Sequence, residues 1–204
     1  MSDGLEATAK QALRVSLLDR RRSLPTASRA MLDRQLCVGV LDFFASRPGA
    51  RVSAFWAFRG EPDLTPALEM LHSTDRQLYL PVLKNRQMTF RRWIPEARLE
   101  PNQFGIPEPL DGEPCAADRL DWVLMPLVAF SAAGARLGMG GGFYDRCFAF
   151  RLAAPPGCGP RLIGVAYGFQ QVDSLPIQAW DVPMDAVITD RGLLECRPLE
   201  SPSA

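Results

Sequence analysis

The stretch DWVLMPLVAF, residues 121–130, decides how this chain is expected to fold. All of its residues are apolar except Asp121 and Pro126. A continuous apolar run of this length is typical of a strand that is covered on both faces, as strands of parallel sheets are. The stretch therefore predicts a buried strand in a sheet that is flanked by other elements on both sides.

Helical and strand patterns alternate around this stretch. Apolar residues spaced by four, with breaks at Pro25 and Pro48-Gly49, predict helices over 5–24 and 28–46. Further helices are predicted over 143–153 and over 65–72, where Thr65 is expected to be the N-cap before Pro66. Strand patterns cover 51–58, 77–83, 88–93, 161–169 and 185–192, and a connection rich in proline, glutamate and glycine spans 94–119.

This alternation predicts an α/β fold. We expect a single domain over residues 1–204, with an open, mostly parallel sheet covered by helices on both faces, as in Rossmann-like three-layer folds. Residues 1–48 are expected to form an N-terminal helical segment, and residues 195–204 a flexible tail.

Composition excludes several classes of function. The formal net charge of the 204 residues is zero, which disfavours sequence-independent binding to nucleic acid or to an anionic membrane. No apolar run approaches the ~20 residues that a membrane helix needs, and the first ten residues lack the apolar core of a secretory signal. The five cysteines are scattered and form no Cys-x-x-Cys pair, so we expect a reduced protein in the cytoplasm.

A glycine loop, RLGMGGGFYDR at residues 136–146, follows the buried strand. Its backbone N–H groups and the start of the next helix are expected to hold an anion, with Arg136 and Arg146 supplying charge. A side chain at the central Gly141 would stand in the way of such an anion. The spacing matches neither the P-loop nor the dinucleotide fingerprint, which Phe143 interrupts, and a purely structural turn is the alternative.

Charged residues elsewhere suit a site for a polyphosphate and a metal. Lys10 and Arg14 share one helix face, although such a pair is usually a solvated surface. Asp145 stands beside the glycine loop, where a carboxylate is a natural Mg²⁺ ligand, and a stabilising role in the first helical turn is equally plausible. Asp181 offers a second acidic group before the last predicted strand, or simply a turn aspartate.

Two further residues favour an organic ligand over covalent hydrolysis. Glu61 follows the predicted strand 51–58, where open α/β sheets bind ligands, and Trp56 can flank a planar ring or belong to the core. His72 is the only histidine, and no Gly-x-Ser-x-Gly motif accompanies it. A Ser-His or Cys-His site is therefore poorly supported.

Seven segments, in this order, resemble the 5-formyltetrahydrofolate cyclo-ligase family, also called 5,10-methenyltetrahydrofolate synthetases. They are KQALR (10–14), AFWAFRGEPDL (54–64), LPVL (80–83), FGIPEP (104–109), VLMPLVAFSAAGARLGMGGGFYDR (123–146), GVAYGFQ (164–170) and LPIQAWDVPMDAVIT (175–189). The resemblance implies an enzyme that converts 5-formyltetrahydrofolate to 5,10-methenyltetrahydrofolate with ATP and Mg²⁺, releasing ADP and phosphate. It also implies a route in which the formyl oxygen is phosphorylated and N10 of the folate then attacks the formyl carbon. We expect this enzyme to be a monomer.

The resemblance also implies a set of site residues. The catalytic residues are Lys10, Arg14, Glu61, Arg136, Tyr144 and Arg146. ATP is expected at Lys10, Gln11, Ala12, Leu13, Arg14, Arg136, Leu137, Gly138, Met139, Gly140, Gly141, Gly142, Phe143 and Tyr144. The folate is expected at Trp56, Glu61, Met139, Gly140, Gly141, Gly142 and Phe143, and Mg²⁺ at Asp145 and Asp181. Many family members have Tyr or Arg in place of Met139, and His in place of Trp180.

Three other functions compete with this interpretation. A non-catalytic protein of the same fold would bind folate or nucleotide without turnover. A nicotinamide dehydrogenase would need the missing third glycine. An enzyme for coenzyme A or a sugar phosphate would prefer other phosphorylated ligands.

Overall fold

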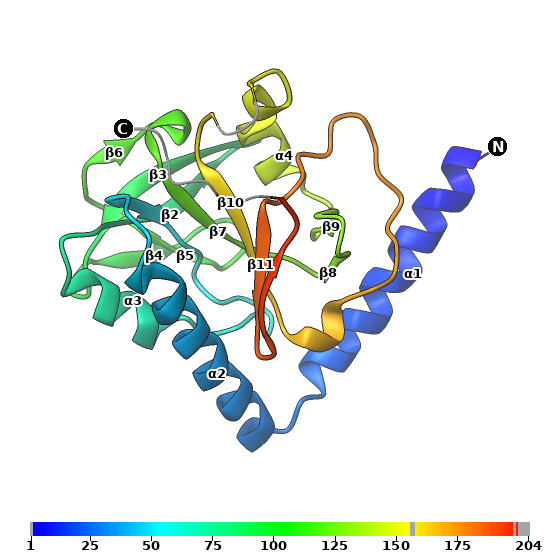
Figure 1. Ribbon diagram of the computed structural model, residues 1–204, viewed down its shortest axis with the longest axis horizontal. Helices are drawn as coiled ribbons and strands as arrows, with labels where there is room; N and C mark the ends of the chain where they lie inside the picture. Colours follow the sequence, from blue (N-terminus) through cyan, green and yellow to red (C-terminus); the bar gives the residue numbers. More distant parts are fainter. Residues whose placement is uncertain (1, 156–157, 198, 200–204) are drawn as a thin grey trace.

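A computed structural model describes residues 2–155, 158–197 and 199, which form a main sheet with helices on both sides and two small two-stranded sheets (Figure 1). The helices are α1 (Ser2–Arg22), α2 (Thr26–Ala45), α3 (Thr65–His72) and α4 (Phe143–Cys147), with 3-10 turns η1 (Ala117–Arg119), η2 (Ala149–Leu152) and η3 (Gly168–Gln170). The strands are β1 (Arg51–Ser53), β2 (Gln77–Lys84), β3 (Gln87–Trp93), β4 (Leu99–Pro101), β5 (Pro107–Pro109), β6 (Pro114–Cys115), β7 (Trp122–Pro126), β8 (Ala129–Phe130), β9 (Arg136–Leu137), β10 (Arg161–Val165), β11 (Ala186–Thr189) and β12 (Gly192–Glu195).

The main sheet has eight strands in the order β12-β11-β10-β7-β1-β2-β3-β6. Its five central strands, from β11 to β2, are parallel, and β12, β3 and β6 add antiparallel pairs at the two sides. The apolar stretch 121–130 supplies β7 at the centre, where Val123, Leu124 and Met125 are fully buried. The predicted α/β fold with a mostly parallel sheet is therefore confirmed.

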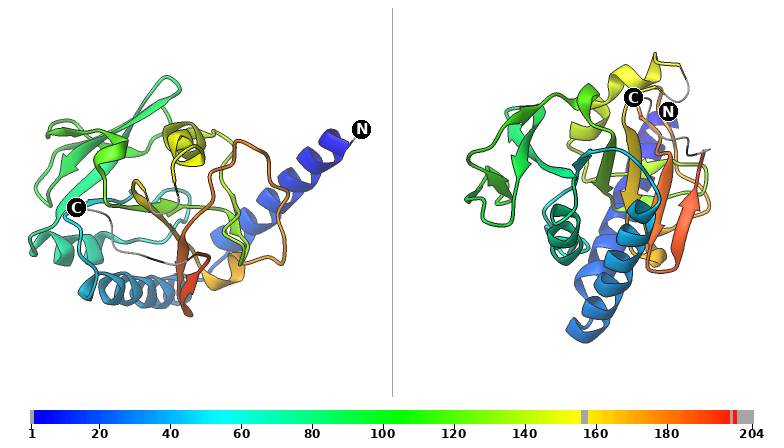
Figure 2. Two further views of the ribbon diagram at one scale, coloured as in Figure 1. Left: turned by 45° about the horizontal axis from the view of Figure 1, so that its top comes forward. Right: turned by 60° about the vertical axis from the view of Figure 1, so that its left-hand side comes forward.

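Helices cover the two faces of the sheet unequally. On one face, α2 and α3 bury an apolar stripe that includes Leu36, Val40 and Leu68. On the other face lie the short α4 and η2, and Phe148 between them is also fully buried. Figure 2 shows the sheet between these two layers. Within the described residues, no helix has both the length and the apolar character that crossing a membrane requires.

Helix α1 reaches away from the body of the sheet, and its N-terminal turns project furthest (Figures 1 and 2). Its later part packs through Leu17 on the small β8–β9 hairpin and on Leu175. This placement carries residues from the start of the chain to the edge of the sheet where β7 ends. The side chain of Leu5, on the predicted apolar stripe, lies outside the described residues, and Ala9 on the same stripe is exposed.

Several element boundaries differ from the sequence predictions. The predicted strand 51–58 ends at Ser53, and residues 54–58 continue as an irregular segment that carries side chains toward the site. The stretch 121–130 divides into β7 and β8, which belong to different sheets. The N-cap of α3 is Leu64 and not Thr65, because Thr65 is already the first helical residue.

Two predicted segments also behave differently at their ends. The helix predicted over 143–153 stops at Cys147 and continues as the 3-10 turn η2. The tail predicted from residue 195 begins with ordered backbone, since Cys196 and Arg197 both donate to the carbonyl of Asp185. Residues 198 and 200–204 lie outside the described part.

Candidate active site

A cavity of ≈ 570 Å³ opens where the central parallel strands end. Its walls come from the segments that follow β1 and β7, from β2, from the glycine loop after β9 and from residues 178–181. Helix α1 adds Lys10 and Arg14 from the side. Loops that leave the carboxyl ends of parallel strands meet at one edge of the sheet, which is why segments so distant in sequence share this cavity.

One end of the cavity is charged. Lys10 Nζ lies 3.7 Å from Oδ2 of Asp181, and the Nε of Arg14 donates to the carbonyl of Gly138 over 2.8 Å. Both cations of α1 therefore face the glycine loop and the segment 178–181. Both residues line the cavity, which favours a ligand-binding role over a solvated helix face.

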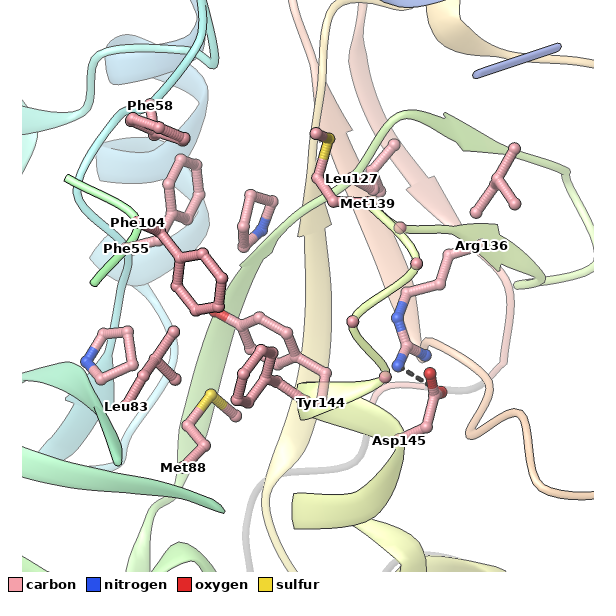
Figure 3. A pocket seen from close by; sticks show the side chains of 18 of the residues that line it. Phe55, Phe58, Leu83, Met88, Phe104, Leu127, Arg136, Met139, Tyr144 and Asp145 are labelled. Atoms are coloured by element: carbon pink, nitrogen blue, oxygen red, sulfur yellow. Dashed lines mark hydrogen bonds and ion pairs between the residues drawn. The ribbon is translucent and has the colours of Figure 1, made fainter. Parts of the chain in front are cut away.

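A second ion pair closes the far side of the glycine loop. The Nη2 of Arg136 lies 2.5 Å from Oδ1 of Asp145, which also accepts a hydrogen bond from the N–H of Val182 over 3.2 Å. Arg136 also donates to the carbonyl of Val182. Figure 3 shows Arg136 and Asp145 joined on one side of the loop, with the apolar side chains of the cavity on the other. Asp145 thus lies next to the segment that carries Asp181.

The glycine loop needs its glycines at particular positions. Gly140 and Gly142 have φ angles of 92° and 62°, in the left-handed region that disfavours other residues. Gly141, which the sequence suggested as the critical position, has no positive φ. A Cβ at Gly141 would instead lie 2.9 Å from the Phe143 ring. The backbone requirement therefore falls on the glycines at either side of Gly141.

The opposite end of the cavity is apolar and aromatic. Figure 3 shows Phe55, Phe58 and Phe104 gathered on one side, opposite Tyr144. The ring of Phe104, at the tip of the β4–β5 hairpin, lies 5.9 Å from that of Phe143 in an edge-to-face arrangement. Rings from three separate segments thus form a slot that suits a planar heterocycle.

Glu61 is the acidic group of this apolar end. Its side chain is 9% exposed, its Oε2 accepts a hydrogen bond from the N–H of Phe58 over 3.1 Å, and its Oε1 lies 3.9 Å from Nη2 of Arg21. Burial raises the pKa of Glu61 to about 7, against the opposing effects of Arg21 and the Phe58 hydrogen bond. Burial, and next the charge of Glu61, raises the pKa of Tyr144, so this phenol stays a hydrogen-bond donor.

Most residues proposed from the sequence line this one cavity. They are Lys10, Arg14, Trp56, Glu61, Arg136, Leu137, Gly138, Met139, Gly140, Gly141, Gly142, Phe143, Tyr144, Asp145 and Asp181. Four do not line it: Gln11, Ala12, Leu13 and Arg146. Gln11 and Ala12 are exposed on α1, and Leu13 packs on the apolar cluster under that helix. Arg146 is exposed and donates to the carbonyl of Arg86.

Several residues of the cavity wall were not predicted from the sequence. Asn102, Phe104, Ile106 and Glu108 all come from the β4–β5 hairpin, which was interpreted as a surface connection. Glu108 accepts hydrogen bonds from the N–H of Leu83 and from Asn102, which fixes the hairpin against β2. The segment FGIPEP (104–109) could have indicated this wall, because it is one of the segments that resemble the family although no function was assigned to it.

Comparisons with known proteins agree on one family. The 5-formyltetrahydrofolate cyclo-ligase family matches residues 6–190. The chain is 35% identical over 175 residues to a 5-formyltetrahydrofolate cyclo-ligase of Escherichia coli (strain K12), covering 83% of this chain and 94% of that one. It is 31% identical over 183 residues to the enzyme of that name from Haemophilus influenzae, covering 86% and 94%. The solved structure of Aquifex aeolicus 5,10-methenyltetrahydrofolate synthetase superposes with a TM-score of 0.80 at 30% identity, covering 96% of each chain.

Proposed function

The chain belongs to the 5-formyltetrahydrofolate cyclo-ligase family, and we propose that the cavity at the end of the parallel strands is its active site. The protein is an enzyme that closes 5-formyltetrahydrofolate to 5,10-methenyltetrahydrofolate at the expense of ATP. The observation that carries the site assignment is the convergence of Lys10, Arg14, Glu61 and Asp145 on one cavity from three separate segments.

The folate occupies the aromatic end in this proposal. The pterin is planar and carries N–H donors, and the slot offers ring faces together with the carboxylate of Glu61. Each oxygen of Glu61 has a second lone pair beyond its present contact, so the carboxylate can accept from the pterin. Trp56 lines the same end, 6.2 Å from the buried ring of Trp93. The folate therefore meets one fixed acceptor within an apolar wall.

ATP occupies the charged end. Lys10, Arg14 and Arg136 supply three cations around the glycine loop, whose backbone leaves room for phosphate oxygens. The formyl oxygen then takes the γ-phosphoryl group, N10 closes the ring at the formyl carbon, and phosphate leaves. Phosphoryl transfer depends mainly on positioning and on charge neutralisation, which these cations provide without a nucleophilic side chain.

Asp145 and Asp181 would hold Mg²⁺ beside the phosphates. Among the described residues no group of three or more histidine, cysteine, aspartate or glutamate side chains is arranged to hold a metal. Two carboxylates nevertheless suit Mg²⁺, which commonly takes one or two carboxylates plus substrate phosphates and water. Both line the cavity, from adjacent segments. When bound, the ion neutralises negative charge on the transferred phosphoryl group.

The remaining expectations are also proposals. We propose that the enzyme acts as a monomer in the cytoplasm on small molecules, without a nucleic-acid or membrane partner. The zero formal net charge supports the absence of nucleic-acid and membrane partners, because neither nucleic acid nor an anionic membrane is attracted to a neutral protein as a whole.

Formation of the product tests the proposed function. Purified protein is incubated with 5-formyltetrahydrofolate and Mg-ATP, and the absorbance band of methenyltetrahydrofolate is followed against a sample without ATP. We expect the band to grow only with ATP, and ADP to appear in equal amount. Binding of folate and ATP without the band would support a non-catalytic binding protein instead.

A further inference from the structure

Arg21 is buried although it stands in a run of three arginines at the end of α1. Three consecutive arginines at a helix end are ordinarily exposed to solvent. Arg20 and Arg22 fit that pattern, but the side chain of Arg21 is only 1% exposed. Burying a guanidinium is costly unless nearby groups compensate its charge and its N–H donors. The surroundings of Arg21 therefore indicate what it does.

Arg21 ties three walls of the active-site region together. Its Nε donates to the carbonyl of Arg59 over 3.2 Å, and its Nη1 donates to the carbonyl of Leu127 over 3.3 Å. Its Nη2 lies 3.9 Å from Oε1 of Glu61 and has no hydrogen-bond partner in the described structure. The guanidinium thus links α1 to the turn that presents Glu61 and to the segment after β7.

A second arginine holds the same turn without reaching the carboxylate. Arg29 of α2 donates to the carbonyl of Gly60 over 2.9 Å and to the carbonyl of Arg21 over 2.6 Å. The turn needs such support, because Arg59 and Gly60 both have positive φ angles, of 50° and 78°. Arg29 is therefore a matched control, since it shares the structural role of Arg21 and lacks the contact with Glu61.

We propose that Arg21 is a positioning residue for the cyclo-ligase reaction, which favours the charged form of the Glu61 carboxylate and holds it toward the folate. The proposal rests on the function proposed above for Glu61. A neutral carboxyl group would be a poor partner for pterin N–H donors, and an unpaired carboxylate would be disfavoured in this apolar wall. The buried guanidinium of Arg21 opposes protonation of Glu61 and compensates the charge of the carboxylate within the apolar wall.

The other charged and titratable groups around this pair are few. Arg59 belongs to the same turn as Glu61 and points toward the Phe58 ring, 5.0 Å from its centroid. Besides burial, the charge of Glu61 contributes to the raised pKa of Tyr144 in α4. Besides the effects of burial and Glu61, the pKa of Arg21 is raised by Tyr167 and lowered by Arg29 and Arg22. Burial raises the pKa of Glu61 to about 7 even with Arg21 in place, so loss of Arg21 should raise it further.

Titration of Glu61 without substrate tests the proposal directly. The ¹³C carboxyl resonance of Glu61 is assigned by its loss in Glu61→Gln and followed against pH in the full-length protein. An opposite charge this close typically lowers a carboxyl pKa by about one to three, so Arg21→Met should move the midpoint up by about one pH unit or more. Arg21→Lys should restore most of the shift, and Arg29→Met should leave the midpoint unchanged. An unmoved midpoint in folded Arg21→Met would overturn the proposal.

Kinetics give a second, independent measurement. In Arg21→Met, KM for 5-formyltetrahydrofolate should rise about fivefold or more at neutral pH and recover toward the wild-type value as the pH is raised. A merely structural role would raise KM equally at every pH and would be shared by Arg29→Met. Should the wild-type protein form no product, the carboxyl titration still decides the role of Arg21, so the two proposals fail separately. If Arg21→Met does not fold, Arg21→Gln, which keeps N–H donors and removes the charge, takes its place in both measurements, with the same expected shift and the same Arg29→Met control.

Discussion

Asp145 is held by Arg136 through an ion pair of 2.5 Å, and the same carboxylate oxygen accepts the backbone N–H of Val182. This arrangement joins the glycine loop to the segment that carries Asp181. A proposed metal ligand is therefore also a structural tie between two walls of the cavity. The two roles can be separated, because a higher Mg²⁺ concentration restores the occupancy of a weakened metal site but does not restore a lost ion pair or hydrogen bond.

Asp145→Asn is expected to raise the Mg²⁺ concentration needed for half-maximal activity. The amide keeps the shape of the side chain but removes the charge that a hard divalent ion prefers. Activity should recover partly as Mg²⁺ is increased. Asp118→Asn, on the exposed turn η1, is the control and should leave the Mg²⁺ requirement unchanged. A defect in Asp145→Asn that no Mg²⁺ concentration relieves would assign Asp145 a purely structural role.

Lys10→Ala and Arg14→Ala are expected to raise KM for ATP while KM for folate changes little. Lys10 lies 3.7 Å from Asp181 and Arg14 is hydrogen-bonded to the loop carbonyl of Gly138, so both face the charged end. A hydrogen bond to a charged group contributes ~1.5–3 kcal/mol, which corresponds to roughly a ten- to hundredfold change. Initial rates at varied ATP measure it. Arg22→Ala, on the exposed side of the same helix, is the matched control, and an equal effect there would refute the assignment.

Glu61→Gln is expected to weaken folate use by roughly ten- to a hundredfold, because the amide presents a donor where the pterin also presents donors. Isothermal titration with folate and with Mg-ATP separates the two ligands. The folate affinity should fall while the affinity for Mg-ATP is kept. The reverse pattern would place Glu61 in the nucleotide site.

The same substitution should alter how stability depends on pH. Folding raises the pKa of Glu61 from 4.5 to about 7, so the folded state binds this proton more tightly than the unfolded state does. The stabilising contribution of the protonated group is therefore complete below pH 4.5 and is lost as the pH rises to about 7. Relative to wild type, Glu61→Gln should gain up to about 3 kcal/mol across this window, measured by urea unfolding at each pH. The exposed Glu69→Gln should gain none.

Local patterns were sufficient to predict the fold and part of the site. The apolar run 121–130 predicts a buried strand because β7 is covered on both faces, and the glycine loop stands out because Gly140 and Gly142 adopt a conformation that other residues avoid. Arg21 could not be found in this way. Its burial depends on Arg59 and Leu127, which tertiary folding alone brings to it.

The aromatic wall escaped prediction for a similar reason. A hairpin whose strands are three residues long, β4 and β5, has too few residues to show an alternating pattern. Phe104 at its tip is 47% exposed and looks like an ordinary surface residue until its contact with Phe143 is known. Arg146 differs from the other predicted catalytic residues, because it does not line the cavity. Its position after the glycines suggested an anion contact, whereas its guanidinium donates to the carbonyl of Arg86.

The glycine loop gives the last prediction, in which strain and function are compared at matched positions. Gly140 has a φ of 92°, and a Cβ there would meet only Arg14 at 3.9 Å, so Gly140→Ala introduces backbone strain with little steric conflict. Gly192, the first residue of β12, has a φ of 120° and open space around its Cβ, so Gly192→Ala introduces the same kind of strain at a residue that does not line the cavity. Both variants should lose about 1–2 kcal/mol of stability. Only Gly140→Ala should lose the rise in Tm that Mg-ATP causes, because only there does the backbone have to leave its phosphate-binding shape. Equal rises in Tm with Mg-ATP for both variants and the wild type would mean that the glycines at 140–142 form a turn and nothing more.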